Sequence, residues 1–227
     1  MTFDEKKGMY FPSDDILNKA NVKEYNNLYK YSIENKEQFW AEQAGHLEWY
    51  KKWDKVMDDT DKPFYKWFQG GKINIVHNAI DRHLQTANRN KLAIIWEGEN
   101  GDVRTFSYHA FNREVSKFAN ILKSMGVRKG NIVTIYMPQI PEQIIAMLAC
   151  AKIGAVHSVV YGGFSHEALS DRIKDAESRV VVTADGGYRR GKIADLKAIV
   201  NEAVVLCPTV EVVITVKRTG QDVYMES

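Results

Sequence analysis

The sequence feature that most constrains this chain is a series of four short apolar runs separated by segments with helical spacing. The runs are apolar throughout rather than alternating with polar residues, which is typical of strands in a sheet covered on both faces. Helical segments between the runs act as crossovers, so neighbouring strands are expected to be parallel. The predicted fold class is therefore α/β, with an open, mostly parallel, doubly wound sheet formed by residues 132–137, 156–160, 180–183 and 210–216.

Capping signals mark the ends of the connecting helices. Ser107 precedes a helix that Gly126 ends, and Pro141 opens a second helix that Gly154 follows. Ser165 opens a third helix. Two apolar runs around a polar turn predict a hairpin ahead of this region, at residues 92–96 and 103–106.

The first part of the chain has a different composition from the α/β pattern. It is rich in Tyr, Trp, Asn, Lys and Glu, and apolar spacing predicts an amphipathic helix that includes Tyr25, Leu28, Tyr29 and Ile33. The acidic run at residues 58–63 has the composition of a solvated linker. We therefore expect a helical N-terminal extension over residues 1–66 and a partial α/β subdomain over residues 67–227.

Composition excludes several classes of protein. The formal net charge is +2, from 31 Lys and Arg against 29 Asp and Glu, which does not favour nucleic-acid binding. Two cysteines are too few for a disulfide scaffold, and neither has zinc-ligand spacing. The N-terminus lacks the apolar stretch of a signal peptide, and the longest apolar run, residues 144–151, is far below the roughly 20 residues of a membrane span. We therefore expect a cytoplasmic protein without nucleic-acid or membrane partners.

The most informative loop follows the third predicted strand, because ligands of doubly wound sheets bind at the carboxyl ends of strands. Arg189, Arg190 and Lys192 place three positive charges within four residues. Glycines such as Gly191 let backbone N–H groups approach a ligand, and a helix expected to begin near Ile193 adds the positive end of its dipole. Arginine forks suit phosphate oxygens, so the loop predicts a phosphate-binding site. The alternative is a solvated basic turn.

The same loop also fits the pattern G-x-x-x-x-G-K, which is typical of an ATP-binding P-loop. Ile193 stands where a magnesium-binding hydroxyl is needed, and the next predicted strand runs into Lys217 and offers no acidic residue. We therefore disfavour a P-loop.

The pair Gly162 and Gly163 fits either a plain strand-to-helix turn or a passage for a thin ligand. No hydrolase triad, metal site or other catalytic centre can be assembled from the sequence.

Four segments are informative through their joint occurrence. They are Lys66-Trp67-Phe68-Gln69-Gly70-Gly71-Lys72-Ile73-Asn74, Ile135-Tyr136-Met137-Pro138 with Ile140-Pro141-Glu142, Gly154-Ala155-Val156-His157-Ser158-Val159-Val160-Tyr161-Gly162-Gly163-Phe164-Ser165, and Thr183-Ala184-Asp185-Gly186-Gly187-Tyr188-Arg189-Arg190-Gly191-Lys192. In this order they resemble the acetyl-CoA synthetases, the AMP-forming acetate–CoA ligases of the acyl-adenylate-forming superfamily. The resemblance covers nearly the whole chain from about residue 25.

The resemblance implies a reaction in two steps, with acetate, Mg-ATP and CoA as small-molecule substrates. Acetate attacks the α-phosphate of ATP to give acetyl-adenylate and pyrophosphate, and the CoA thiolate then displaces AMP. It also implies that Gly163 lines the path of pantetheine and that the phosphorylated nucleotide end of CoA is held by Arg189, Arg190, Gly191 and Lys192. Lys192 stands where some relatives carry Arg, which replaces a bidentate contact by a point charge.

The family's ATP loop, acetate pocket, ribose-binding aspartate and catalytic lysine have no counterpart in these 227 residues, which correspond to about the first third of such an enzyme. We therefore expect an N-terminal segment that supplies part of the CoA site, is inactive alone, and has the remainder of the enzyme as a partner. A non-catalytic binding or interaction module derived from a truncated synthetase is the alternative.

Overall fold

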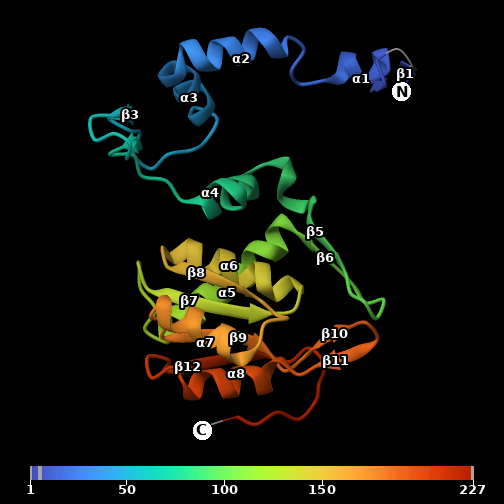
Figure 1. The fold of residues 1–227 in the computed structure, drawn as a ribbon, viewed down its shortest axis with the longest axis vertical. Coiled ribbons are helices and arrows are strands. Elements are labelled where there is room, and N and C mark those ends of the chain that lie inside the picture. The colour runs from blue at the N-terminus through green and yellow to red at the C-terminus, as the bar shows by residue number, and fades with distance from the viewer. Residues whose placement is uncertain (1, 5–6, 226–227) are drawn as a thin grey trace. The chain divides into compact units, whose positions relative to one another are not determined.

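The computed structural model describes residues 2–4 and 7–225 and divides into two units, Met1–Lys72 and Ile73–Ser227 (Figure 1). Each unit is described separately. The expected boundary between an extension and an α/β subdomain, at residues 66 and 67, lies within the first unit, and that division into domains stays a prediction.

The first unit consists of short elements with little buried surface. Its helices and strands are β1 (Thr2–Asp4), β2 (Met9–Phe11), α1 (Asp14–Lys19), α2 (Tyr25–Glu34), α3 (Lys36–Ala44), β3 (Lys55–Asp58) and β4 (Lys66–Gln69). Among the side chains described in this unit, only Ala44 is buried. The rings of Trp49, Trp53 and Phe68 form an aromatic cluster, with centroids 5.0 to 5.5 Å apart.

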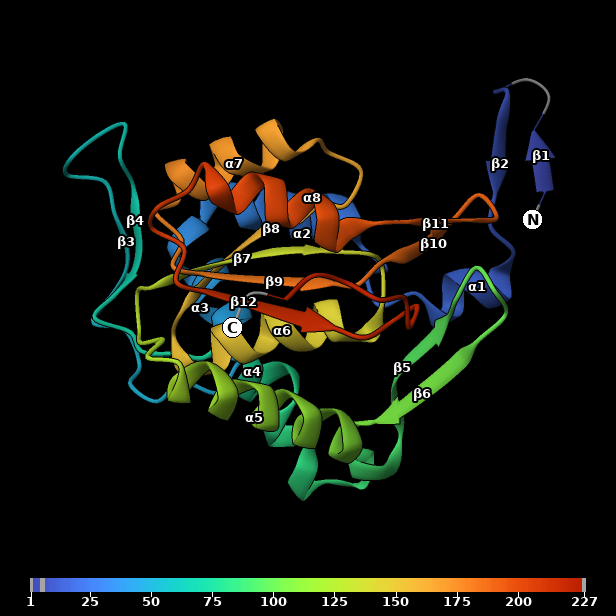
Figure 2. The ribbon, with the colours of Figure 1, turned by 90° about the horizontal axis from the view of Figure 1, so that it is seen from below.

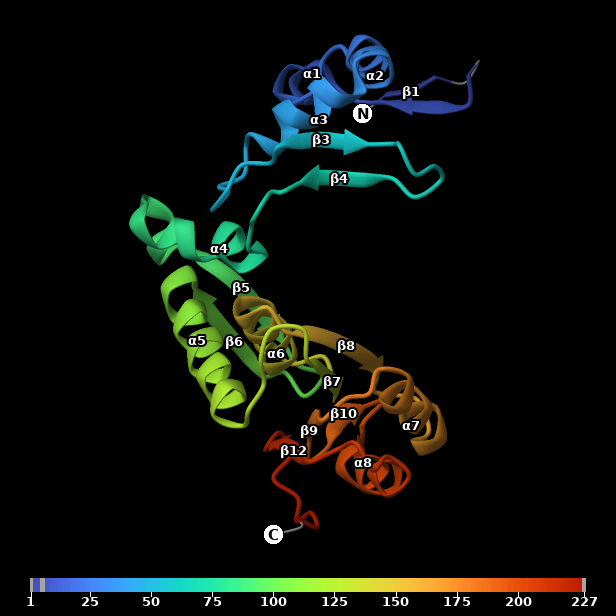
Figure 3. The ribbon, with the colours of Figure 1, turned by 90° about the vertical axis from the view of Figure 1, so that its left-hand side faces the viewer.

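The structure modifies two expectations for this unit. The helix that includes Tyr25 and Ile33 forms as α2, but both side chains are exposed, and two hairpins accompany the helices. The acidic run at residues 58–63 is not a linker, because it begins at the end of β3 and continues in the loop that joins β3 to β4 (Figure 3). A long hairpin loop is as solvated as a linker, so composition alone does not separate the two.

The second unit is built on a parallel sheet of four strands in the order β12–β9–β7–β8. Every residue of β9 is buried, as its unbroken apolar sequence predicts. The prediction of a doubly wound, mostly parallel α/β fold is therefore confirmed. The strands are β7 (Ile132–Met137), β8 (Val156–Tyr161), β9 (Val180–Ala184) and β12 (Val212–Val216).

Helices cover both faces of this sheet. The pair α5 (Tyr108–Ser124) and α6 (Pro141–Ile153) lies on one face, and the pair α7 (His166–Asp175) and α8 (Leu196–Val205) lies on the other (Figure 2). Ile135 of β7 belongs to the apolar cluster under α5 and α6, whereas its neighbour Tyr136 belongs to the cluster under α7 and α8. Alternate residues of a strand therefore stabilise opposite faces of the sheet.

The capping predictions for these helices are confirmed. Ser107 and Ser165 each accept a backbone N–H from the first turn of their helix, at 3.2 and 3.4 Å. Pro141 begins α6, where its missing N–H costs no helical hydrogen bond. Gly154 ends α6 in the left-handed region, with φ of 76°.

The helix expected near Ile193 begins later, because the basic loop forms a further hairpin. β10 (Gly187–Arg189) pairs antiparallel with β11 (Lys192–Ala194), and the two turn residues, Arg190 and Gly191, both have positive φ, 53° and 72°. Such a backbone is typical of two-residue hairpin turns. α8 therefore begins at Leu196, three residues after the start expected near Ile193.

The remaining elements precede the sheet in sequence. The predicted hairpin is confirmed as β5 and β6, which pair antiparallel around the polar turn. Among the residues that the structure describes, no helix is both long enough and apolar enough to cross a membrane. The elements are α4 (Ile75–Ala79), two 3-10 helices (Asp81–Gln85 and Ala87–Asn90), β5 (Leu92–Glu97) and β6 (Val103–Ser107).

Candidate functional site

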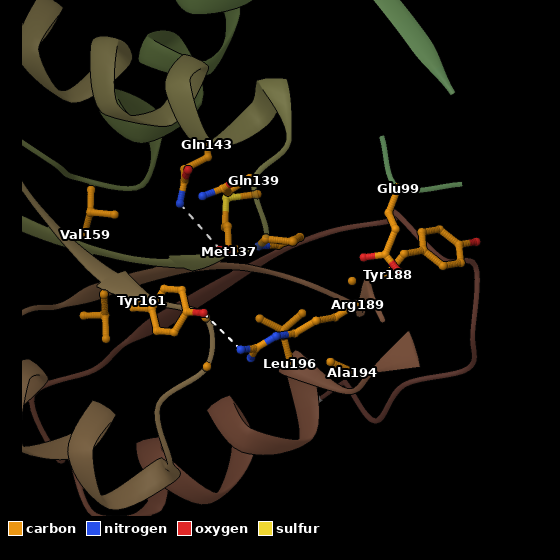
Figure 4. Close-up of a pocket in the computed structure, with 15 residues that line it drawn as sticks. Glu99, Met137, Gln139, Gln143, Val159, Tyr161, Tyr188, Arg189, Ala194 and Leu196 are labelled. Carbon is orange, nitrogen blue, oxygen red and sulfur yellow. Dashed lines mark hydrogen bonds between the residues drawn. The ribbon is translucent and has the colours of Figure 1, made fainter. Parts of the chain in front are cut away.

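A cavity of about 550 Å³ lies at the carboxyl ends of β7 and β8 (Figure 4). Its size falls within the usual range of small-molecule sites, about 300–1,000 Å³. Apolar residues, including Met137, Val159 and Leu196, form part of its wall. The polar part of the wall is formed by Glu99, Gln139, Gln143, Tyr161, Tyr188 and Arg189.

The cavity lies where the winding of the sheet reverses. β8 and β9 flank β7 on opposite sides, and the helix after β7 covers one face while the helix after β8 covers the other. The loops that follow β7 and β8 therefore diverge and leave space between them, which is the usual position of ligands in open α/β sheets. The prediction that a ligand site lies at these strand ends agrees with the position of the cavity.

Arg189 and Gly163 come together at one wall of this cavity. The Arg189 guanidinium donates a hydrogen bond to the Tyr161 hydroxyl at 3.1 Å, and it lies 5.7 Å from the centroid of that ring (Figure 4). A methyl group at Gly163 would lie 2.7 Å from Nη1 of Arg189 and 2.6 Å from the Tyr161 ring. The absence of a side chain at Gly163 therefore leaves the space that the guanidinium and the ring occupy.

The other three predicted site residues lie at the tip of the β10–β11 hairpin. Arg190, Gly191 and Lys192 are exposed and do not line the cavity. The Gly191 N–H is not free for a ligand, because it donates a hydrogen bond to Oε1 of Glu99 at 2.6 Å. A phosphate that binds this N–H must displace the Glu99 carboxylate first.

Asp185 fixes the backbone on which the hairpin stands. Its side chain is buried and accepts four backbone N–H groups, from Gly186, Arg218, Thr219 and Gly220, at 2.7 to 3.1 Å. Burial alone raises the pKa of this carboxyl, but the N–H donors outweigh it and leave the pKa below its ordinary value. Asp185 is therefore a charged anchor between the end of β9 and the segment after β12.

The described residues offer no cluster of His, Cys, Asp and Glu that could hold a metal ion. Both cysteines are unpaired and buried, and burial raises the pKa of the Cys150 thiol to about 12. A thiol with such a pKa is not a nucleophile near neutral pH. Neither cysteine lines the cavity, whose polar wall carries amide, hydroxyl, carboxylate and guanidinium groups.

Sequence reasoning missed several residues of the cavity wall. Tyr161 and Tyr188 lie within the segments that the sequence singled out, but a tyrosine in a loop carries no signal of its own. Glu99 is 92 residues away from its partner Gly191 along the chain, so only the fold brings the two together. The polar turn between two predicted strands was the one sign that Glu99 would be exposed.

The fold defines an α/β domain of the doubly wound class, with a cavity at the carboxyl ends of its strands. The chain belongs to the AMP-binding enzyme family, whose sequence model matches residues 80–226. A second model, described as acetyl-coenzyme A synthetase N-terminus, matches residues 25–79. The resemblance to the acetyl-CoA synthetases is confirmed by these matches.

Individual relatives agree with this assignment. An acetyl-coenzyme A synthetase of Leptospira biflexa is 51% identical over 222 residues, which are 96% of this chain and 34% of that protein. The corresponding protein of Deinococcus radiodurans is 53% identical over 197 residues, 87% of this chain and 30% of its own length. The structure of an acetoacetyl-CoA synthetase from Streptomyces lividans matches with a TM-score of 0.83 at 26% identity, over 90% of this chain and 32% of that one. The chain thus spans about a third of the length of these relatives.

Proposed function

We propose that this chain is the N-terminal segment of an AMP-forming acetate–CoA ligase and contributes one wall of its CoA site. The observation that carries the proposal is the cavity in which the Arg189 guanidinium packs against Gly163 and the Tyr161 ring. CoA has matching parts, since a thin uncharged pantetheine arm is joined to a phosphorylated nucleotide. A cavity whose wall combines apolar side chains with an arginine suits such a molecule.

Each predicted site residue has a role in this proposal. Arg189 binds a phosphate of CoA through its guanidinium fork, and Gly163 lines the path of the pantetheine arm. Arg190 and Lys192 lie outside the cavity and raise the positive potential along the approach to it. The Gly191 N–H binds phosphate after the Glu99 carboxylate has moved away.

We further propose that acetate and Mg-ATP are substrates of the whole enzyme in the cytoplasm and that these 227 residues do not form acetyl-adenylate alone. The chain spans about a third of its relatives, and the wall of the cavity offers no nucleophile or metal site among the described residues. Purified chain is expected to show no acetate-dependent exchange between ATP and pyrophosphate. Exchange above that of a blank without protein would contradict this part of the proposal.

Binding of CoA is the direct test of the cavity. Titration calorimetry should detect weak binding whose dissociation constant increases as salt is added, because phosphate contacts are screened by ions. Dephospho-CoA and pantetheine serve as matched ligands that lack one or all of the phosphates. Salt-independent binding, or equal affinity for pantetheine and CoA, would show that the arginine wall does not bind phosphate.

The interaction-module alternative predicts a different outcome. A chain that serves as a module forms a monodisperse complex with a protein partner, and addition of CoA leaves that complex unchanged. Size-exclusion chromatography with light scattering, in the presence and absence of CoA, separates the two hypotheses.

A further inference from the structure

Arg218 links two hairpins although its side chain does not line the cavity. It follows β12, and its guanidinium donates hydrogen bonds to Oδ2 of Asp102 at 2.7 Å and to Oδ1 of Asn100 at 2.8 Å. Both acceptors belong to the turn between β5 and β6, next to Glu99 in the cavity wall. The Arg218 side chain is only 16% exposed, whereas that of its partner Asp102 is 45% exposed.

The same guanidinium also contacts two aromatic rings. Its central carbon lies 5.1 Å from the ring centroid of Trp96 and 4.9 Å from that of Tyr188. Trp96 belongs to β5 and donates its indole N–H to the Gln139 carbonyl at 2.7 Å, whereas Tyr188 belongs to β10. One charged group therefore contacts β5, the β5–β6 turn and β10, and the turn and β10 border the cavity.

The backbone of Arg218 is fixed independently of its side chain. Its N–H donates to Oδ1 of Asp185 at 2.8 Å, and the next two backbone N–H groups bind the same carboxylate. The backbone hydrogen bonds to Asp185 and the four contacts of the side chain together hold the guanidinium in one place. A planar group with several donors can satisfy two acceptors and two rings at once, which a lysine ammonium cannot.

We propose that Arg218 is a positioning residue that sets the width of the cavity by clamping the β5–β6 turn to the β10–β11 hairpin. This inference rests on the proposed CoA site, because it assigns Arg218 to the geometry of that site. The clamp holds the turn that carries Glu99 against the strand that carries Tyr188 and Arg189. When the clamp is lost, all residues proposed to contact the ligand are still present, but the distances between them are no longer fixed.

The test compares Arg218→Lys with Arg179→Lys. Arg179 forms a matched ion pair, since its Nε donates to Oε1 of Glu211 at 2.8 Å, but both side chains are 54% exposed and neither lines the cavity. Both variants keep the positive charge and lose the planar fork. Hydrogen exchange of the whole chain, read by mass spectrometry, reports on the hairpins, and calorimetry reports the dissociation constant for CoA.

The clamp predicts faster exchange in both the β5–β6 turn and the β10–β11 hairpin of Arg218→Lys, with no change there in Arg179→Lys. It also predicts that the dissociation constant for CoA increases about tenfold in Arg218→Lys, because ring and fork contacts of this kind set the geometry. Unchanged exchange in either hairpin overturns the clamp. Faster exchange with unchanged CoA affinity overturns its role in binding. If the unmodified chain binds no CoA, the proposed function fails, and the exchange data alone still decide the clamp.

Discussion

The two ends of the parallel sheet use similar groups for different purposes. At the amino ends of the strands, Arg179 and Glu211 form an ion pair whose side chains are 54% exposed. At the carboxyl ends, the Arg218 side chain is 16% exposed and pairs with Asp102, which is 45% exposed, and Asp185 is buried. The cavity of about 550 Å³ lies at the carboxyl ends, whereas a hollow at the amino ends, lined by Arg179 and Glu211, measures only about 10 Å³.

The carboxyl ends of the strands therefore hold both the buried anchor and the cavity. An exposed ion pair is worth little, because water and salt screen it, whereas a buried carboxylate with four donors holds its surroundings rigidly. We expect substitutions at the amino ends to change stability slightly and CoA binding not at all. Substitutions at the carboxyl ends should change the affinity for CoA, the stability, or both.

The largest effect is expected from Asp185→Asn. The amide has one acceptor oxygen in place of two and turns N–H groups toward backbone donors, so the loss should be about 2–3 kcal/mol in the free energy of unfolding. Urea unfolding followed by circular dichroism measures it. A loss below about 0.5 kcal/mol, the range of ordinary surface substitutions, would show that the carboxylate is not an anchor.

The pH dependence of stability checks the same carboxylate. The pKa of Asp185 is lowered in the folded protein, so its contribution is complete above the ordinary aspartate pKa of about 3.9 and is lost as pH falls through the folded value. The difference in unfolding free energy between the unmodified chain and Asp185→Asn should therefore be constant near pH 7 and shrink below about pH 4. A difference that grows on acidification contradicts the assigned shift.

Gly163→Ala should weaken CoA binding about tenfold, which corresponds to about 1.4 kcal/mol. The added methyl group must displace the Arg189 guanidinium or the Tyr161 ring, and both lie at the flexible end of a side chain, so stability should change little. Gly130→Ala is the control: Gly130 lies before β7 with φ of 86° and an open environment, so that variant should lose stability and keep its affinity. If only the Gly130→Ala control loses affinity for CoA, the amino ends of the strands rather than the carboxyl ends determine binding.

A smaller effect of opposite sign is expected from Glu99→Gln. The amide competes less well than the carboxylate for the Gly191 N–H and removes a negative charge from the cavity wall, so CoA should bind about threefold more tightly. Glu97→Gln, an exposed residue on the same hairpin, should leave the affinity unchanged. Weaker binding in Glu99→Gln would mean that Glu99 organises the site rather than competing with the ligand.

The smallest effect is expected from Glu211→Gln at the amino ends. It removes an exposed ion pair, so the unfolding free energy should change by less than about 1 kcal/mol. The affinity for CoA should remain that of the unmodified chain. A measurable loss of affinity here would show that the two ends of the sheet are coupled.

Most of the fold could be predicted from local features of the sequence. Pro141 and Gly154 bracket α6 because each suits one end of a helix, and the apolar run of β9 predicts burial on both faces. The β10–β11 hairpin was missed, since Arg190 adopts a positive φ that its residue type does not suggest. The turn depends on the pairing of flanking strands rather than on one glycine.

The sequence predicted the candidate site only in outline. Gly163 and Arg189 were expected near one ligand, and the fold brings them to the same wall. Contacts between distant segments could not be foreseen, because Asp102 and Arg218 lie 116 positions apart in the sequence, which carries no signal of their pairing. The resemblance predicted the family and the site residues, whereas the side chains that contact those residues are seen only in the structure.

The central claim is that Arg189 binds a phosphate of CoA within this cavity. The most direct measurement is the dissociation constant for CoA, by calorimetry, of the unmodified chain, Arg189→Ala and Arg190→Ala. We expect Arg189→Ala to weaken binding at least about tenfold, as loss of a charge-assisted contact does, and to flatten its salt dependence. Arg190→Ala, outside the cavity, should have a smaller effect. An unchanged dissociation constant in Arg189→Ala would contradict the assignment of the CoA site.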